Sequence, residues 1–208
     1  MQSRSVSREL ALLMLGQVND RQPSPDTALD TLLQQALVSL SQHVREALDQ
    51  AASELQAAQQ QLLDSELQDQ GAVEQLPRIR KHLQEGLEHA EQGLNRLSAS
   101  LELPRLLMLA DQEEIRRGAI DRARAVLSGR DDLDQRLDAV MEGWRLTRLP
   151  RIDRDILRLA AVDIEQFRTP AAVACNEAVE LANRYSDEQG RRMINGVLRR
   201  FTSAPAER

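Results

Sequence analysis

The sequence predicts an all-α protein, and three observations support this. Apolar residues recur at intervals of three and four along most of the chain, which is the period of an amphipathic helix. Aromatic residues make up only 2% of the 208 residues, so the core must be built from Leu, Ala, Ile and Val, as in helical bundles rather than sheets. Capping residues, prolines and glycines separate the periodic stretches at helical lengths.

The N-terminal segment predicts one helix and the start of another. Residues 4 to 18 form an amphipathic pattern, and Arg4 and Arg8 lie four residues apart on one face of it. A polar, proline-containing loop is expected over residues 19 to 25, followed by a short helix over residues 26 to 40. The inward positions of the first helix are Val6, Leu10, Leu13, Met14 and Val18.

The next stretch, about residues 41 to 103, predicts an antiparallel helical hairpin. Two heptad-like runs flank a break over residues 71 to 77 that contains glycine and proline, and Pro104 is expected to end the second helix. The runs are Val44, Leu48, Ala51, Leu55, Ala58 and Leu62, and then Leu83, Leu87, Ala90, Leu94, Leu97 and Leu101. All three histidines, His43, His82 and His89, fall here, and their spacing favours surface histidines over a metal site.

Two further helices are expected before residue 149. The capping pattern of Asp111 with Glu114 predicts the start of one, which should end at Gly129. Asp131 or Asp132 should begin the other. The inward residues of this second helix are expected to be Leu133, Leu137, Val140, Met141 and Trp144.

The segment from residue 149 to residue 201 predicts three helices with clear start signals. Pro150 suits a first helical turn, Thr169 with Pro170 forms a cap followed by a first-turn proline, and Ser186 with Gln189 is a capping-box pattern. The three expected apolar stripes are Ile152, Ile156, Leu159, Ala160 and Ile164; Val173, Ala178, Leu181 and Ala182; and Met193, Ile194, Val197 and Leu198.

The last of these helices contains an unfavourable residue pair, Asn195 and Gly196. Glycine inside a helix costs about 1 kcal/mol relative to alanine. We therefore expect close approach of a neighbouring helix or a ligand at this point.

Composition restricts the function. The formal net charge of −6 argues against sequence-independent duplex binding, which needs a strongly basic face. The single cysteine, Cys175, excludes a disulfide framework and a cysteine metal site and fits a reducing compartment. The chain carries neither a membrane-length apolar segment nor a signal-peptide pattern, so a soluble cytoplasmic protein is expected. No phosphate-binding glycine motif or catalytic constellation is present, so we expect neither an enzyme nor a cofactor.

Arginines are more clustered than the net charge suggests. Arg151, Arg154 and Arg158 share one helical face, while Arg192 and Arg199 lie two turns apart on another. Taken alone, each group is most simply interpreted as a solvated face.

Three runs in the C-terminal half resemble the NusB family of bacterial transcription antitermination factors in order and spacing. They cover residues 153 to 160, 176 to 182 and 194 to 198. The resemblance implies a NusB-like helical bundle formed by residues 1 to 40 and 104 to 201. Residues 41 to 103 would then be an inserted helical hairpin, and residues 202 to 208 a disordered tail. For the hairpin we favour a solvated spacer over a partner-binding arm.

The resemblance also implies a surface for single-stranded RNA. In the family, the N-terminal arginine helix and the last helix together hold a short element of ribosomal RNA called boxA. Guanidinium groups suit phosphates, amides read base edges, and Met193 stands where the family commonly has an aromatic residue. The corresponding residues here are Arg4, Arg8, Gln189, Arg192, Met193 and Asn195. Only two of the family's N-terminal arginines are kept, the others being Ser5, Val6 and Ser7.

A second surface is implied for NusE, a ribosomal protein of the small subunit that acts with NusB in the family. Asp153, an acid in the first turn of its predicted helix, belongs to that surface by resemblance; the alternative is a first-turn acid favoured by the helix dipole. The implied function is binding of nascent ribosomal RNA together with NusE, so that RNA polymerase reads through terminators. A net acidic chain with a small basic patch would need such a partner to bind RNA tightly.

Two other functions remain open at this stage. The first is a helical adaptor that binds proteins but not RNA, which the few N-terminal arginines and Met193 favour. The second is the NusB-like domain of an RNA cytosine methyltransferase, against which stands the end of the sequence at Arg208. Homodimerisation is left undecided by the sequence.

Overall fold

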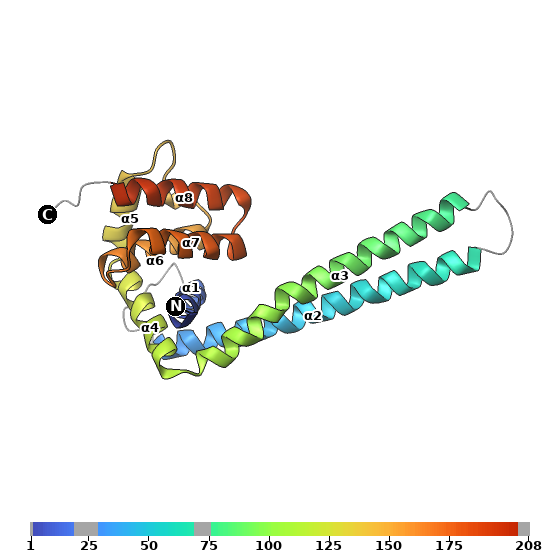
Figure 1. Ribbon diagram of the computed structural model, residues 1–208. Coiled ribbons are helices and arrows are strands. Elements are labelled where there is room, and N and C mark those ends of the chain that lie inside the picture. Colours follow the sequence, from blue (N-terminus) through green and yellow to red (C-terminus); the bar gives the residue numbers. More distant parts are fainter. Residues whose placement is uncertain (1, 19–28, 69–75, 204–208) are drawn as a thin grey trace. The chain divides into compact units, whose positions relative to one another are not determined.

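The computed structural model describes residues 2–18, 29–68 and 76–203, and within these ranges the protein is built from helices without a strand, which confirms the predicted fold class (Figure 1). The loop expected over residues 19 to 25 lies outside the described residues. The helices are α1 (Gln2–Gln17), α2 (Leu29–Gln68), α3 (Leu76–Ala110), α4 (Glu113–Ser128), α5 (Arg130–Ala139), the short 3₁₀ helix η2 (Leu146–Arg148), α6 (Arg151–Glu165), α7 (Ala171–Tyr185) and α8 (Glu188–Ser203).

The chain divides into two compact units. One contains residues 1–37 and 109–208, and the other contains residues 38–108. The helices do not stop at the expected boundaries: α2 continues through residue 40 without a break, and α3 continues through Pro104 to Ala110. Pro104 therefore does not end its helix, although its ring removes one backbone hydrogen-bond donor from it.

The unit of residues 38–108 is an antiparallel pair formed by α2 and α3. Small residues make its closest contacts: a Cβ atom on Gly93 would lie 3.2 Å from the carbonyl oxygen of Ala51, and one on Gly86 would lie 3.3 Å from that of Ala58. Both alanines are buried. Leu55 also lies at this contact, with its Cγ 3.2 Å from the position of a Cβ atom on Gly93. The leucines that were expected to form the seam are nevertheless between 40% and 72% exposed. These leucines are Leu48, Leu55, Leu62, Leu83, Leu87 and Leu94.

Two histidines link the helices of this pair. Nδ1 of His82 lies 2.6 Å from the side-chain oxygen of Gln61, and Nδ1 of His89 lies 2.7 Å from a carboxylate oxygen of Glu54. They are therefore partly buried cross-helix residues rather than free surface histidines. The side chain of His43 lies outside the described residues.

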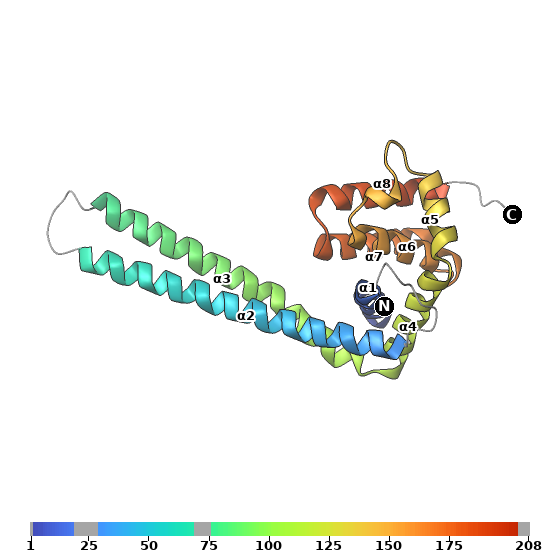
Figure 2. The same ribbon diagram turned by 180° about the vertical axis from the view of Figure 1, so that it is seen from behind.

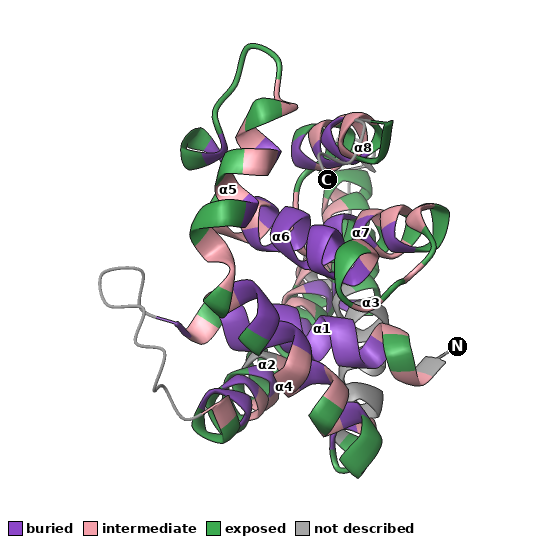
Figure 3. Ribbon diagram, turned by 90° about the vertical axis from the view of Figure 1, so that its left-hand side faces the viewer, coloured by how far each residue is buried: buried purple, intermediate pink, exposed green. Residues whose placement is uncertain are grey.

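The other unit is organised around α6. Ten of its fifteen residues are buried, so the helix is enclosed on nearly all sides (Figure 3). Helix α1 packs against α4 and α6, and α7 and α8 pack against α6 and against each other (Figures 1 and 2). Close approach of α1 and α4 occurs at Gly118, where a Cβ atom would lie 2.8 Å from Oγ of Ser7.

The buried Arg158 and the partly exposed Arg151 join α6 to its neighbours, contrary to the solvated face that the sequence suggested. Nε of Arg158 donates to Oδ1 of Asp134 at 2.6 Å, and its Nη1 donates to Oδ1 of Asp155 at 2.7 Å. Nη2 of Arg151 donates to the carbonyl oxygens of Leu15 at 2.6 Å and Val18 at 2.5 Å. Arg151 thus adds a donor to two carbonyl groups at the C-terminal end of α1, of which that of Leu15 also accepts from the backbone N–H of Val18 at 3.1 Å.

Several helix starts differ by one or two residues from their predicted positions. Helix α4 begins after Gln112 rather than at Asp111, and α5 begins directly after Gly129, which also ends α4. Pro150 and Pro170 are the N-caps of α6 and α7 rather than first-turn residues.

Two expected inward side chains face solvent, and the expected tail is partly helical. Val173 is exposed, and Trp144 lies in the segment after α5, which ends at Ala139. Helix α8 reaches Ser203, so the first two residues of the expected disordered tail are helical; residues 204–208 lie outside the described part of the chain. None of the described helices is long and apolar enough to cross a membrane.

Candidate nucleic-acid interface

Arg8 is a structural residue in the folded protein, which corrects the expectation that it contacts RNA. Its side chain is only 4% exposed. Its Nε donates to the carboxylate of Asp163 on α6, and its Nη1 lies 3.6 Å from the carboxylate of Glu177 on α7. Nε of Arg122 on α4 donates to the other oxygen of Asp163 at 2.9 Å. The guanidinium of Arg8 therefore joins α1 to α6 and α7 and is not available to a phosphate.

Arg4, in contrast, is exposed near the start of α1. It lines an open pocket of about 540 Å³ together with residues of α4, including Glu113 and Arg117. Nearby, the guanidinium carbon of Arg122 lies 4.5 Å from the centre of the Phe167 ring, a cation–π contact.

The remaining predicted RNA-binding residues all lie on α8. Gln189 is exposed, Met193 and Asn195 are partly exposed, and the side chain of Arg192 is 75% exposed. Arg192 donates to Glu188 one turn earlier. An exposed ion pair of this kind contributes little to stability, so the guanidinium of Arg192 can exchange its partner at low cost.

The structure does not bring α1 and α8 together into one cradle. Helix α8 packs on α6 and α7, whereas α1 packs on α4 and α6, so that α6 and α7 lie between them (Figure 3). The expectation that Arg8 and Arg192 lie side by side is therefore wrong, and the exposed residues of α8 lie apart from α1.

Asp153 is buried rather than part of an exposed partner surface. It is 2% exposed, and the hydroxyl of Ser186 donates to its carboxylate. Its Oδ1 has no hydrogen-bond partner within the described residues. A Cβ atom on Gly190 would lie 2.8 Å from Oδ2 of Asp153 and 2.2 Å from Oγ of Ser186. Gly190 is thus the glycine at which α8 approaches its neighbours closely.

Gly196, where close approach was expected, lies beside open space. A Cβ atom on this residue would have no atom of the described chain within 4 Å, apart from its own helix and chain neighbours. The first turn of α8 is instead fixed by Asp187, whose Oδ1 accepts a hydrogen bond from the backbone N–H of Gly190 at 2.7 Å. The capping residue is therefore Asp187 and not Ser186.

The environment of Asp153 leads to a prediction on pH. Burial raises the pKa of its carboxyl group above the ordinary value of 3.8, the charge of Asp187 raises it further, and the hydrogen bond from Ser186 partly opposes them. The pKa of Asp153 is therefore higher in the folded protein than in the unfolded chain, and the unfolded chain releases this proton at a lower pH. As pH rises between these two pKa values, ionisation favours the unfolded chain and lowers the free energy of unfolding. The loss of stability persists at higher pH.

Asp153→Asn removes this ionisation. We expect the free energy of unfolding of the variant, relative to the parent protein, to increase between about pH 3.5 and about pH 7. Urea denaturation at both pH values checks this. A difference that stays constant or decreases over the same interval would contradict it.

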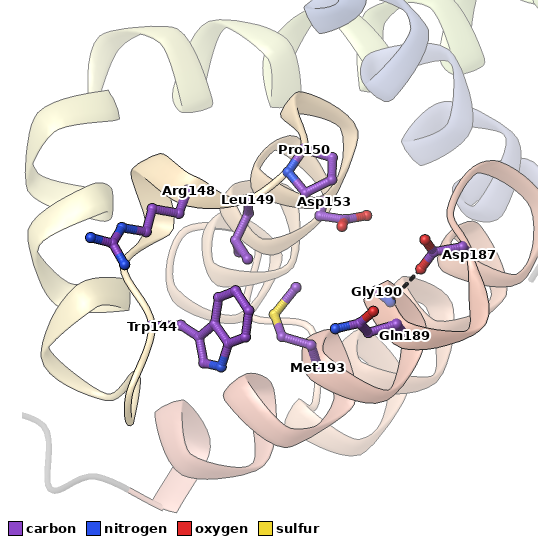
Figure 4. Close-up of a pocket in the computed structure, with 9 residues that line it drawn as sticks. All are labelled: Trp144, Arg148, Leu149, Pro150, Asp153, Asp187, Gln189, Gly190 and Met193. Atoms are coloured by element: carbon purple, nitrogen blue, oxygen red, sulfur yellow. Dashed lines mark hydrogen bonds between the residues drawn. The ribbon is translucent and has the colours of Figure 1, made fainter.

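A pocket of about 230 Å³ lies beside Asp153, between the start of α6 and the first turns of α8 (Figure 4). Its lining residues are Trp144, Arg148, Leu149, Pro150, Asp153, Asp187, Gln189, Gly190 and Met193. Sequence reasoning missed Trp144 and Arg148 as part of this site. The sequence signal for the end of the helix is Gly143, one residue before Trp144. In the structure its φ is 74°, a conformation that suits glycine and interrupts a helix.

Among the described residues, no group of three or more His, Cys, Asp or Glu side chains is placed to hold a metal ion. The side chains that line or adjoin the pocket include an exposed indole, a thioether, an amide and guanidinium groups. These are the groups that stack on bases, read their edges and pair with phosphates.

Comparison with known proteins identifies the family of this chain. The model of the NusB family matches residues 88–203. A transcription antitermination protein NusB from a Synechococcus species is 45% identical over 204 residues, which cover 98% of this chain and 94% of the relative. Proteins of the same name from Gloeothece citriformis and Gloeobacter violaceus are each 41% identical over 202 residues, covering 97% and 96% of this chain and 93% and 94% of the relatives. The chain belongs to the NusB family.

These relatives also bear on the hairpin. The family model begins at residue 88, so most of the hairpin lies outside it. The alignment with the Synechococcus protein nevertheless covers nearly all of this chain, including that region. The sequence of this region is therefore shared with the Synechococcus relative.

Proposed function

We propose that this protein is a transcription antitermination factor that binds a boxA-like element of nascent ribosomal RNA together with NusE. The complex then acts on RNA polymerase so that it reads through terminators. Membership of the NusB family supports the role in antitermination. The observation that carries the RNA-binding part is the group formed by the exposed Gln189 and Arg192 and the partly exposed Met193 at the start of α8, beside Trp144.

The RNA contacts of this proposal are narrower than the sequence suggested. Arg192 pairs with a phosphate, Gln189 and Asn195 offer amides to base edges, and Met193 provides an apolar contact. Arg4 remains an exposed cation for a more distant part of the RNA. Arg8 acts only by holding α1 in place, and Asp153 acts by supporting the first turn of α8 rather than by touching NusE.

The distribution of charge supports the need for a partner. Residues 38–108 contain 11 acidic and 6 basic residues, whereas the rest of the chain contains 22 acidic and 21 basic residues. Residues 1–37 and 109–208 together are thus nearly neutral. Tight RNA binding through phosphates requires more positive charge than this, which a second protein would supply.

The test is a binding titration of a boxA RNA and a scrambled RNA, with and without NusE, over a range of salt concentrations. We expect selective binding of the boxA RNA that NusE strengthens. Arg192→Ala should reduce the slope of log affinity against log salt by about 0.7, the value for one phosphate contact on a single strand. Arg124→Ala, which removes an exposed and similarly ion-paired arginine of α4, is the matched control and should leave the slope unchanged.

Two results would contradict the proposal. Equal binding of the boxA and scrambled RNAs would remove sequence selectivity. No binding of either RNA, even with NusE, would favour a protein adaptor, a function that burial of Arg8 and separation of α1 from α8 make the next alternative.

A further inference from the structure

Trp144 is the only tryptophan of the chain, and it is 55% exposed. It lies between the end of α5 at Ala139 and the short helix that begins at Leu146. Leu146 itself is almost fully buried, so the loop is anchored directly after the exposed indole. A large aromatic ring that is held in place at a pocket mouth is a surface on which another flat group can stack.

The rest of the pocket complements this indole. Figure 4 shows Trp144 beside Met193, with Leu149 adjoining them, so that one end of the pocket is apolar. The other end is polar and contains the amide of Gln189 and the carboxylate of Asp153. The guanidinium of Arg148 points outward at the rim.

Asp153 provides a second and independent indication of a ligand. Its side chain is almost completely buried, it lines the pocket, and its Oδ1 lacks a hydrogen-bond partner within the described residues. A buried carboxylate oxygen without a donor is costly, and buried polar atoms of native proteins usually have a partner. A hydrogen-bond donor on the bound group would remove this cost.

We infer that this pocket holds one unpaired RNA base, stacked on Trp144 and Met193, with its exocyclic amino group donating to Asp153. This inference rests on the proposed function and names the part of the RNA that the site reads. A base fits because it combines a flat apolar face with edge donors, as the two ends of the pocket require. At about 230 Å³ the pocket is smaller than those that hold drug-sized molecules, which suits a single ring system rather than a peptide helix.

The same geometry predicts which bases are preferred. Cytosine and uracil are both pyrimidines of similar size, but cytosine carries an amino group where uracil carries a carbonyl oxygen. Only cytosine can donate to Oδ1 of Asp153 at that position, while the carbonyl oxygen of uracil would face a carboxylate oxygen without a hydrogen between them. The pocket therefore favours oligocytidylate over oligouridylate of equal length.

The chain offers a direct measurement, because Trp144 is its only source of tryptophan fluorescence. We expect oligocytidylate to quench this emission and to bind more tightly than oligouridylate. In parallel, the fluorescence anisotropy of end-labelled boxA RNA reports binding in a way that does not depend on Trp144. Trp144→Ala should weaken that binding roughly 5- to 150-fold, the range for loss of one stacked base, without changing the salt slope.

Two variants control for other effects. Trp144→Phe keeps an aromatic ring and should retain most of the affinity. Val173→Ala shortens another exposed apolar side chain, on α7, and should leave RNA binding unchanged. Because Trp144 is outside the core, thermal unfolding should show that the Ala variant folds like the parent protein.

The outcomes separate this inference from the proposed function. Selective boxA binding by anisotropy, with no change in Trp144 emission and an unaffected Trp144→Ala variant, overturns the inference and leaves the function standing. Quenching by oligocytidylate with equal binding of boxA and scrambled RNA supports the inference and contradicts the function. Equal affinity for oligocytidylate and oligouridylate overturns the part assigned to Asp153, and no RNA binding by either method overturns both proposals.

Discussion

Asp163→Ala is expected to lower the free energy of unfolding by about 3–5 kcal/mol, because it leaves buried positive charge without its partner. Asp163 accepts hydrogen bonds from Arg8 on α1 and from Arg122 on α4, and all three side chains are buried. Without this carboxylate the two guanidinium groups lose the negative charge that they share. Of the ion pairs described for these two arginines, the one between Arg8 and Glu177, at 3.6 Å, would remain.

The measurement is urea denaturation at neutral pH, and the control is an ion pair on the same helix. Glu165 lies near the end of α6 and accepts from Nη1 of Arg136 at 2.5 Å in a partly exposed pair. Glu165→Ala should cost no more than about 1 kcal/mol. Equal decreases in the free energy of unfolding for the two variants would show that burial of the ion pairs of Asp163 does not increase their contribution to stability.

A compensated variant tests the physical reason further. Replacing Arg8 and Arg122 with methionine together with Asp163→Leu removes the charges as well as the carboxylate. We expect this triple variant to recover much of the stability that Asp163→Ala loses, because well-packed apolar groups can replace a buried ionic cluster. A triple variant as unstable as Asp163→Ala would mean that the loss of stability comes from altered packing and not from unpaired buried charge.

Gly190→Ala and Gly196→Ala are expected to change stability in opposite directions, although both glycines lie in α8. At Gly190 the new methyl group would meet Oγ of Ser186 at 2.2 Å and Oδ2 of Asp153 at 2.8 Å. Either the hydrogen bond between Ser186 and Asp153 breaks or the first turn of α8 shifts. We expect a loss of about 2–3 kcal/mol, within the range for overpacking of a filled site.

At Gly196 a methyl group would meet no atom of another described element within 4 Å, so alanine brings only its better helix propensity. We expect a gain of about 1 kcal/mol in the free energy of unfolding. Thermal or urea unfolding of both variants measures the pair. A gain at Gly190 or a loss at Gly196 would contradict the positions that the structure gives to the two glycines.

Local sequence signals were sufficient for the helices themselves. Periodicity located α1, α4, α6, α7 and α8 and the start of α5 within a few residues, because amphipathic stripes and helix ends depend on neighbours in sequence. It did not predict the short helix η2. The signals failed where a local rule was overridden: Pro104 lies within α3, and α5 ends at Ala139, before the periodic pattern does. Trp144 therefore lies in a loop rather than in the core.

The burial and charge partners of single side chains could not be predicted from the sequence. Arg4 and Arg8 share a face of one helix and would be assigned the same role, yet one is exposed and the other buried. The difference depends on Asp163, 155 residues away along the chain from Arg8. Only packing of α1 on α6 brings these two residues together.

The sequence by itself determined the helical class of this protein, its resemblance to the NusB family and the antiparallel hairpin, since these follow from short-range patterns and ordered runs. The tertiary structure alone decided that Arg8 is an internal ion-pair residue, that Arg192 on α8 lies apart from α1, and that Trp144 and Met193 line one pocket. The physical reason is that burial and charge pairing are set by residues distant in sequence, whereas helix formation is set mainly by near neighbours.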